Sequence, residues 1–267
     1  MFRLTSLNLN GIRSATSKGV ENWMASAQPD CICVQEVKAQ AADVAHRLER
    51  LAGLQGHFHF AEKKGYSGVG VYTRHEPSDV LVGYGSAEFD AEGRYVELRF
   101  DTPARKLSII SAYFPSGSSG DERQQAKFRF LDEFHPHLMR VKGEREFILC
   151  ADVNIAHQPI DLKNWRSNQK NSGFLPEERA WMTKLLHKSD AGGGIVDVYR
   201  QLQPAATDSA YTWWSNRGQA YANNVGWRLD YHLATPELAA LARTESIYKG
   251  EKFSDHAPVT VDYELSL

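Results

Sequence analysis

Short apolar runs that end in polar residues occur three times along the chain. They are Leu4–Leu7, followed by Asn8 and Asn10; Cys31–Val34, followed by Glu36; and Phe147–Cys150, followed by Asp152 and Asn154. Runs of this length, rich in β-branched and aromatic residues, are typical of strands buried on both faces. Strands that each end in an acid or an amide are expected to converge on one rim of a sheet, where ligands bind in α/β proteins.

The residues after the third run suit the activation of a water molecule. Residues i and i+2 of a strand face the same way, so Asp152 and Asn154 are expected side by side. The carboxylate can accept a proton or bind a cation, and the amide can hold a water or an oxyanion. The alternative is a strand-end Asx turn that only caps the next loop.

The remaining periodicities predict an α/β fold. Val20, Trp23, Met24 and Ala27 predict a helix that ends before Pro29, and apolar residues from Ala41 to Ala52 predict another that Gly53 ends. Residues 57–114 alternate in short runs and predict an antiparallel meander. Further helices are expected through Phe128–Leu138 and from Pro176, and strands near Asp230–Ala234 and Ala257–Tyr263. Two packed sheets with helices outside follow, as one domain over residues 1–267.

Composition excludes a membrane protein and leaves partners open. The chain has 42% hydrophobic and 24% charged residues, and no apolar run approaches the length of a membrane span. No targeting segment precedes the first strand, so a cytoplasmic location is expected. The three cysteines lie inside apolar strands and are expected to be reduced core thiols. A net charge of −2 neither requires nor forbids a nucleic-acid partner.

A second polar cluster introduces the last strand. Asp255 and His256 are adjacent, so in extended backbone they point to different partners, and the carboxylate that orients His256 is expected from elsewhere. Asp230 is the candidate. The alternative is a purely structural histidine.

Six motifs, in the same order along the chain, resemble those of the exonuclease III type of abasic-site DNA repair endonuclease. They are Asn8-x-Asn10-Gly11-Ile12-Arg13, Gln35-Glu36, Asp152-Val153-Asn154, the stretch from Asn171 to Arg179, Val225-Gly226-Trp227-Arg228-Leu229-Asp230-Tyr231, and Ser254-Asp255-His256-Ala257-Pro258. The broader endonuclease/exonuclease/phosphatase superfamily shares only the Asn, Glu, Asp-x-Asn and Ser-Asp-His elements. The stretches 173–179 and 226–231 indicate the DNA repair branch.

The resemblance implies a four-layer α/β sandwich and magnesium-dependent hydrolysis of a DNA phosphodiester, with Mn²⁺ as a possible substitute. Glu36 would hold the cation, with Asn8 and Asp255 at its edge. Asp152 would orient or deprotonate the attacking water, held by Asn154. His256, oriented by Asp230, would stabilise the charged phosphoryl oxygens. Whether the aspartate or the histidine is the base stays open.

The resemblance also implies contacts to DNA. Tyr113 matches a tyrosine that contacts the scissile phosphate, although by itself it would be a core aromatic residue. The other implied DNA-binding residues are Asn10, Asn168, Asn171, Trp213, Arg217, Trp227 and Leu229. Of these, Trp213, Trp227 and Leu229 would surround a small apolar pocket for the base-less sugar; without the resemblance the tryptophans could be core residues and the asparagines solvated. Phosphate-backbone contacts are plausible for Lys38, Lys63, Arg123, Lys163, Arg166, Lys170 and Arg217, each of which could instead be a solvated charge.

Two positions depart from the family pattern. Ala151 stands before Asp152 where relatives usually have glycine, and it would be strained if that position needed a positive φ. The segment Ser215–Asn224 carries Arg217 and Gly218 where some relatives carry apolar wedges, which leaves room for a member that mainly trims 3′ ends.

The expected function is therefore incision 5′ to abasic sites by a monomer, with 3′-to-5′ exonuclease and 3′-phosphodiesterase activities. The expected partners are double-stranded DNA with abasic sites or blocked 3′ ends. The alternatives are a 3′-end-processing nuclease with weak abasic cleavage, a phosphoinositide phosphatase or sphingomyelinase relative, and a catalytically silent DNA-binding module. The last would be expected to lack Glu36, Asp152 or His256, and all three are present.

Overall fold

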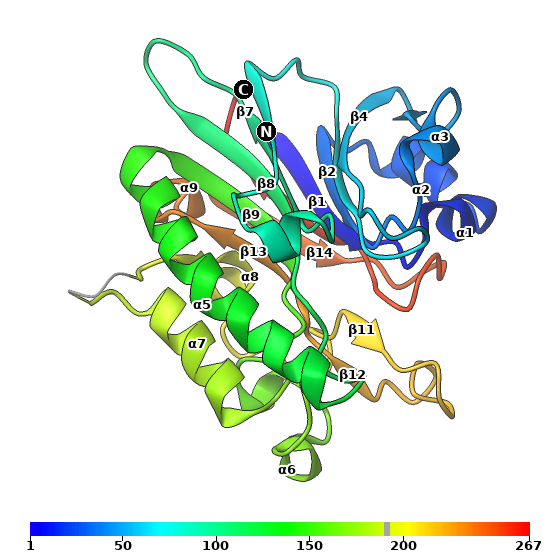
Figure 1. Cartoon of the computed structure of the whole chain (residues 1–267), viewed down its shortest axis with the longest axis vertical. Helices are drawn as coiled ribbons and strands as arrows, with labels where there is room; N and C mark the ends of the chain where they lie inside the picture. The colour runs from blue at the N-terminus through cyan, green and yellow to red at the C-terminus, as the bar shows by residue number, and fades with distance from the viewer. Residues whose placement is uncertain (190–192) are drawn as a thin grey trace.

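The computed structural model describes residues 1–189 and 193–267, which form two mixed sheets packed face to face (Figure 1). The first sheet has the order β14-β15-β1-β2-β5-β4-β3 and the second β10-β13-β9-β8-β7-β6. The first contains β1 (Phe2–Asn8), β2 (Cys31–Gln35), β3 (Arg50–Leu51), β4 (Leu54–His59), β5 (Val69–Thr73), β14 (Ala242–Ile247) and β15 (Val259–Tyr263). The second contains β6 (Asp79–Val82), β7 (Tyr95–Arg99), β8 (Leu107–Tyr113), β9 (Glu146–Asp152), β10 (Val196–Asp197) and β13 (Asp230–Ala234), and a separate ribbon pairs β11 (Trp213–Trp214) with β12 (Gly226–Trp227).

Helices cover the outer faces of both sheets. The helices are α1 (Ile12–Ser17), α2 (Val20–Ala27), α3 (Ala41–Val44), α4 (Ala87–Asp90), α5 (Asp121–Glu144), α6 (Trp165–Asn168), α7 (Pro176–Leu186), α8 (Val198–Leu202), α9 (Pro236–Ala239) and the 3-10 turn η1 (Pro159–Asp161). Of these, α8 and α9 pack against the core between the sheets, and α6 contacts η1. Figure 1 shows α5 and α7 side by side against one sheet, and α1 to α3 beside the other. None of the helices in the described part of the chain is long and apolar enough to cross a membrane.

Three apolar clusters account for the layers. One lies between the sheets and contains Val71, Leu98 and Ile148. A second fills the space under α5 and α7, and a third the space under α1, α2 and α3. Two sheets with a helical layer on each outer face are the predicted four-layer α/β sandwich, which is confirmed.

Strand pairing brings the polar strand ends together. β1 and β2 are parallel, with Asn8 opposite Gln35. β8 and β9 are also parallel, and their register places Tyr113 opposite Asp152. On the other side of β9, Asp230 at the start of the antiparallel β13 pairs with Asp152. Asp152 therefore lies at the centre of one rim, as the three polar strand ends predicted.

The predicted helix over Ala41–Ala52 is wrong beyond Val44. The chain leaves the helix at Ala45 (ψ 145°), and residues 50–55 form a hairpin in which Leu51 pairs with Leu54. The turn residues Ala52 and Gly53 have φ values of 48° and 82°, as a two-residue hairpin loop requires. Leu48, Leu51 and Leu54 are buried either way, so helical spacing of apolar residues could not distinguish the two conformations.

The predicted meander is divided between the two sheets. β4 and β5 pair in the first sheet, whereas β6, β7 and β8 form consecutive antiparallel pairs in the second. Alternation marks strands but does not show which sheet a strand joins. The strands β1, β2 and β9 and the helix α2 lie where the sequence predicts them.

Candidate active site

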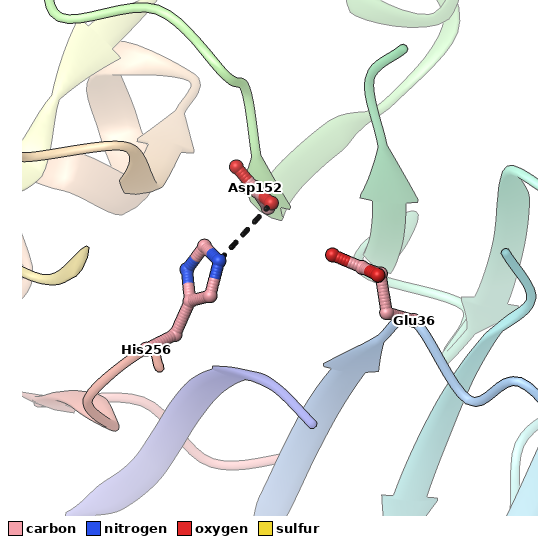
Figure 2. A group of neighbouring side chains, drawn as sticks. All are labelled: Glu36, Asp152 and His256. Atoms are coloured by element: carbon pink, nitrogen blue, oxygen red, sulfur yellow. Dashed lines mark ion pairs between the residues drawn. The ribbon is translucent and has the colours of Figure 1, made fainter. Parts of the chain in front are cut away.

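Glu36, Asp152 and His256 form the centre of the site. Figure 2 shows their side chains converging from the end of β2, the end of β9 and the segment before β15. One ligand atom from each lies within 4.8 Å of the others. Two carboxylates and an imidazole so close together are strongly coupled, and this is the setting in which acid–base groups acquire unusual pKa values.

Both asparagine-containing strand ends form the same local turn. The N–H of Asn154 donates to Asp152 Oδ1 at 3.0 Å, and the N–H of Asn10 donates to Asn8 Oδ1 at 2.9 Å. Asn10 and Asn154 have φ values of 45° and 55°, which asparagine tolerates better than most residues. The Asx turn that was the alternative reading of Asp152–Asn154 is present, and the same turn points Asp152 into the site.

Asn8 holds the two carboxylates in place. It is fully buried, and its Nδ2 donates to Glu36 Oε1 and to Asp152 Oδ2, both at 2.8 Å. The amide therefore bridges the carboxylates from the two sheets. This position fixes their separation and offsets part of their mutual repulsion.

His256 lies between two carboxylates. Its Nδ1 is 2.8 Å from Asp230 Oδ2, the partner that the sequence suggested, and its Nε2 is 3.7 Å from Asp152 Oδ2. Burial alone would lower the pKa of His256, but the carboxylates of Asp230 and Asp152 raise it from 6.5 to about 10. The imidazole is therefore a cation at neutral pH.

The pKa of the Asp152 carboxyl group is also raised. Burial, together with the charges of Asp230 and Glu36, raises the pKa of Asp152 from 3.8 to about 7 against the opposing positive charge of His256. A carboxyl group that titrates near neutral pH is suited to exchanging a proton with water.

The oxygen-rich donor set fits a hard divalent cation. Glu36 and Asp152 offer carboxylate oxygens, the ligands that Mg²⁺ prefers, within the group of three. Glu36 is partly exposed at the rim, with 16% of its side chain accessible, which leaves room for the water ligands that Mg²⁺ retains. His256 Nε2 faces Asp152, so the carboxylates are the better candidates for the first ligands.

Asp255 and Asn10 form a neighbouring polar group. Asn10 Nδ2 donates to Asp255 Oδ1 at 2.9 Å, and Trp213 Nε1 donates to the other oxygen at 3.1 Å. Lys38 Nζ donates to Asn10 Oδ1 at 2.5 Å and pairs with Glu36 Oε2 at 2.7 Å. Asp255 is thus connected to Glu36 through Asn10 and Lys38 and lies outside the group of three.

A cavity of about 230 Å³ opens above these groups. Its walls include Tyr113, Trp213, Trp227 and Leu229, and Asn154 lies at its base. The rings of Trp213 and Trp227 meet edge to face, with centroids 6.3 Å apart. The structure therefore brings the predicted apolar pocket residues together over the acidic centre.

Three predicted DNA-binding residues lie away from this cavity. Asn168 and Asn171 bond to one another at 2.8 Å in the segment that follows α6, and Arg217 is exposed in the loop joining β11 to β12. The cations Lys163, Arg166 and Lys170 are also exposed, and Lys163 pairs with Asp208. None of these residues lines the cavity.

Several residues of the site were not singled out from the sequence. Ser116, Ser118, Ser172 and Gly173 line the cavity. Thr212 Oγ1 accepts the N–H groups of Leu229 and Asp230 at 3.0 and 3.2 Å, fixing the start of β13. Ser172 and Gly173 lay within the quoted motif from Asn171 to Arg179, whereas Ser116 and Ser118 belong to an ordinary Gly/Ser loop that carries no signal of its own.

Ala151 needs no unusual backbone. It lies within β9, opposite Ala112 and Tyr231, and is not among the described residues with positive φ. Its methyl group is fully buried, so the departure from glycine at this position causes no strain.

Fold and site together define a class: a two-sheet α/β sandwich that carries a coupled acid–histidine centre at one rim. The model of the Endonuclease/Exonuclease/phosphatase family matches residues 5–256. An exodeoxyribonuclease from Bacillus subtilis (strain 168) is 34% identical over 259 residues, covering 97% of this chain and 98% of that one. A DNA-(apurinic or apyrimidinic site) endonuclease from Dictyostelium discoideum is 33% identical over 268 residues, covering 99% of this chain and 71% of that one.

A solved structure supports the same conclusion. That of an AP endonuclease from Archaeoglobus fulgidus superposes with a TM-score of 0.85 at 28% identity, covering 99% of this chain and all of that one (100%). The chain belongs to the Endonuclease/Exonuclease/phosphatase family, in its exonuclease III-type branch.

Proposed function

We propose that this protein is a divalent-cation-dependent DNA repair nuclease that cleaves the phosphodiester 5′ to abasic sites. We also propose 3′-to-5′ exonuclease and 3′-phosphodiesterase activities, since all three reactions break the same bond at a phosphate flanked by deoxyribose. The observation that carries the proposal is the grouping of Asp152 with His256 and Glu36, the last two of which line a cavity that Trp213 and Trp227 also line.

The pKa directions assign different tasks to Asp152 and His256. Asp152, whose pKa is raised to about 7, accepts the proton of the attacking water, and the Asn154 amide beside it orients that water. His256, whose pKa is raised to about 10, stays protonated and donates from Nε2 to a phosphoryl oxygen. Asp230 keeps the imidazole charged and correctly oriented.

Glu36, with Asn8 behind it, is the proposed holder of Mg²⁺, and Mn²⁺ would suit the same oxygen ligands. A bound divalent cation would polarise the phosphate and offset charge on the departing oxygen. Tyr113 supports the phosphate from the opposite wall. Burial, with the charges of Glu36 and Asp152, raises the pKa of Tyr113 well above 10, so its hydroxyl stays a donor.

The cavity walls provide selection for a sugar without a base. Trp213, Trp227 and Leu229 offer apolar and aromatic surface, and the adjacent backbone at Gly173 approaches closely. A flipped deoxyribose fits such a space, whereas the same sugar with its base needs more volume.

A basic cleft next to the cavity suits the DNA backbone. Lys63, Tyr66, Arg94 and Arg123 surround a volume of about 380 Å³ that shares Tyr113 with the active-site cavity. Arg94 and Arg123 both pair with Glu92, which holds their guanidinium groups in place. We propose that this cleft binds a phosphate flanking the cleaved one.

The test is a gel assay with two labelled duplexes. One carries a single abasic-site analogue and the other a nick with a blocked 3′ end, each with magnesium or with chelator. We expect incision 5′ to the analogue that is lost with chelator and reduced at least about 100-fold in Asp152→Asn. The matched control, Asp79→Asn, removes a carboxylate that is 60% exposed on β6 and is expected to cleave normally.

The polar β11–β12 loop favours one alternative, a nuclease that mainly processes 3′ ends. Arg217 is exposed there and lies outside the cavity, so no apolar wedge supports the DNA at an abasic site. Processing of the blocked 3′ end without incision would establish this alternative. Turnover of neither DNA would overturn the nuclease proposal and direct the assay to phospholipids and inositol phosphates.

A further inference from the structure

A fully buried ion pair lies behind the active-site cavity. Lys127 of α5 and Glu178 of α7 are both 0% exposed, and Nζ lies 2.7 Å from Oε1. Neither side chain lines the cavity. Burying two charges is unfavourable unless further hydrogen bonds satisfy them, so the contacts of this pair show what it holds in place.

Each member of the pair forms hydrogen bonds with backbone groups of the segments that border the cavity. Lys127 Nζ donates to the carbonyl of Asn154 at 2.7 Å. Glu178 Oε2 accepts the N–H groups of Gly173 and Leu175 at 2.7 and 3.0 Å. The pair therefore connects two chain segments, 152–154 and 173–175, that are separated in sequence and adjacent at the cavity.

These segments have little freedom to shift. Gly173 has a φ of 93°, and a Cβ placed there would lie 3.2 Å from the Asn154 oxygen and 3.2 Å from the ring of Trp227. The Gly173 carbonyl also accepts the N–H of Ala156 at 2.8 Å. A small movement of either segment would thus change both the width of the cavity and the direction of the Asn154 amide.

We propose that Lys127 and Glu178 are positioning residues that fix Asn154 against Gly173, and with them the water-orienting amide and the cavity wall. This inference rests on the proposed nuclease function. It predicts an effect on the chemical step, because Asp152 and Asn154 share one turn. A pair that served stability alone would affect only the amount of folded protein.

The experiment removes the charges as a pair, with Lys127→Met and Glu178→Gln combined. Replacing a buried ion pair by neutral groups of similar size often leaves a protein folded. The matched control is Arg129→Met with Glu88→Gln, a pair that joins the same helix to α4 at 2.7 Å but is 53% and 40% exposed. If the combined buried variant does not fold, Glu178→Asp takes its place, because it keeps both charges and only shortens the carboxylate side chain.

We expect kcat on abasic-site DNA to fall about 10- to 100-fold in the buried-pair variant, as for a small misplacement of catalytic groups, while KM changes less than about threefold. The magnesium concentration for half-maximal rate should be unchanged, because Glu36 and Asn8 are untouched. The exposed-pair control should retain wild-type kinetics. Unchanged kcat in a folded variant would overturn the proposal.

A second measurement tests the positioning role of Lys127 and Glu178 independently of the proposed nuclease function. Hydrogen exchange at the amides of Gly173 and Leu175 reports their bonds to Glu178 without any turnover. Faster exchange in the buried-pair variant, with wild type inactive on DNA, would retain the positioning role and reject only the nuclease function. Unchanged exchange at both amides would reject the positioning role itself.

Discussion

Replacing Asp230 by asparagine should weaken the stabilisation of the protonated His256 imidazole. The substitution keeps the shape of the side chain but removes the carboxylate that lies 2.8 Å from Nδ1. Asp152, the other carboxylate facing the ring, is farther away at 3.7 Å. Since burial by itself opposes the charged imidazole, the variant should hold the His256 proton less tightly than wild type.

The magnitude follows from the pKa of His256. Its rise from 6.5 to about 10 corresponds to about 5 kcal/mol of preferential stabilisation of the cation. Asp230 is the largest favourable contributor, so we assign it roughly half, on the order of 2–3 kcal/mol. The pKa of His256 should therefore fall by about 2 in Asp230→Asn, which still leaves the ring mostly protonated at neutral pH. We expect kcat to fall chiefly at alkaline pH, by about tenfold for each pH unit above the lowered pKa while the wild-type ring keeps its proton.

Two assays measure the ionisation of His256, and both use the metal-free protein. A proton NMR titration follows the His256 ring directly. Unfolding in urea gives the second readout: the folded-state pKa is raised, so the stabilisation is complete below pH 6.5 and is lost as pH rises through about 10. Asp230→Asn should lose less stability over that range than wild type.

A His256 pKa that stays near 10 in the variant would refute this reasoning and give the charge to Asp152 instead. Wild-type kcat at alkaline pH together with the lowered pKa would show that the charge of His256 is not used in the reaction. Asp79→Asn, on an exposed strand, should leave both the titration and the rate unchanged.

Three further predictions concern the cavity, the scaffold and the cation. Gly173→Ala should lower kcat/KM on abasic-site DNA about tenfold and stability by roughly 1–2 kcal/mol, because φ is 93° and a Cβ would approach the cavity wall; steady-state kinetics and urea unfolding check it, and unaltered kinetics would show that this wall can yield. Asp161→Asn should cost about 3–5 kcal/mol by leaving the buried Arg228 with one carboxylate partner fewer. Because Arg228 and Arg200 hold the pKa of Asp161 at about 2, the difference from wild type should be full above pH 3.8 and shrink as pH falls towards 2; a constant difference would contradict this origin. Glu36→Gln should raise the magnesium concentration for half-maximal rate at least about tenfold, and an unshifted magnesium titration would place the cation elsewhere.

The local pattern of apolar and polar residues correctly predicted those elements that had few alternative conformations. The apolar runs ending at Asn8, Glu36 and Asp152 became β1, β2 and β9, because a short run rich in β-branched and aromatic residues has few other stable conformations. The segment Ala41–Ala52 was mistaken for one helix, since a helix and a hairpin bury the same leucines. The difference depended on Ala52 and Gly53 adopting positive φ, which apolar spacing does not report.

The sequence by itself determined the chemistry available: which acids, amides and histidine stand at strand ends, and, through the resemblance of six motifs, which family of sites they suit. Only the tertiary structure decided how they act together. The register of β9 with β8 and β13 places Tyr113 and Asp230 on either side of Asp152, and Asn8 bridges carboxylates that come from two sheets. Charge coupling, and with it the pKa of His256 and of Asp152, depends on distances of a few ångströms between residues that are 26 positions apart (Asp230 and His256) or farther (Asp152 and His256). Such distances exist only once the sheets have packed.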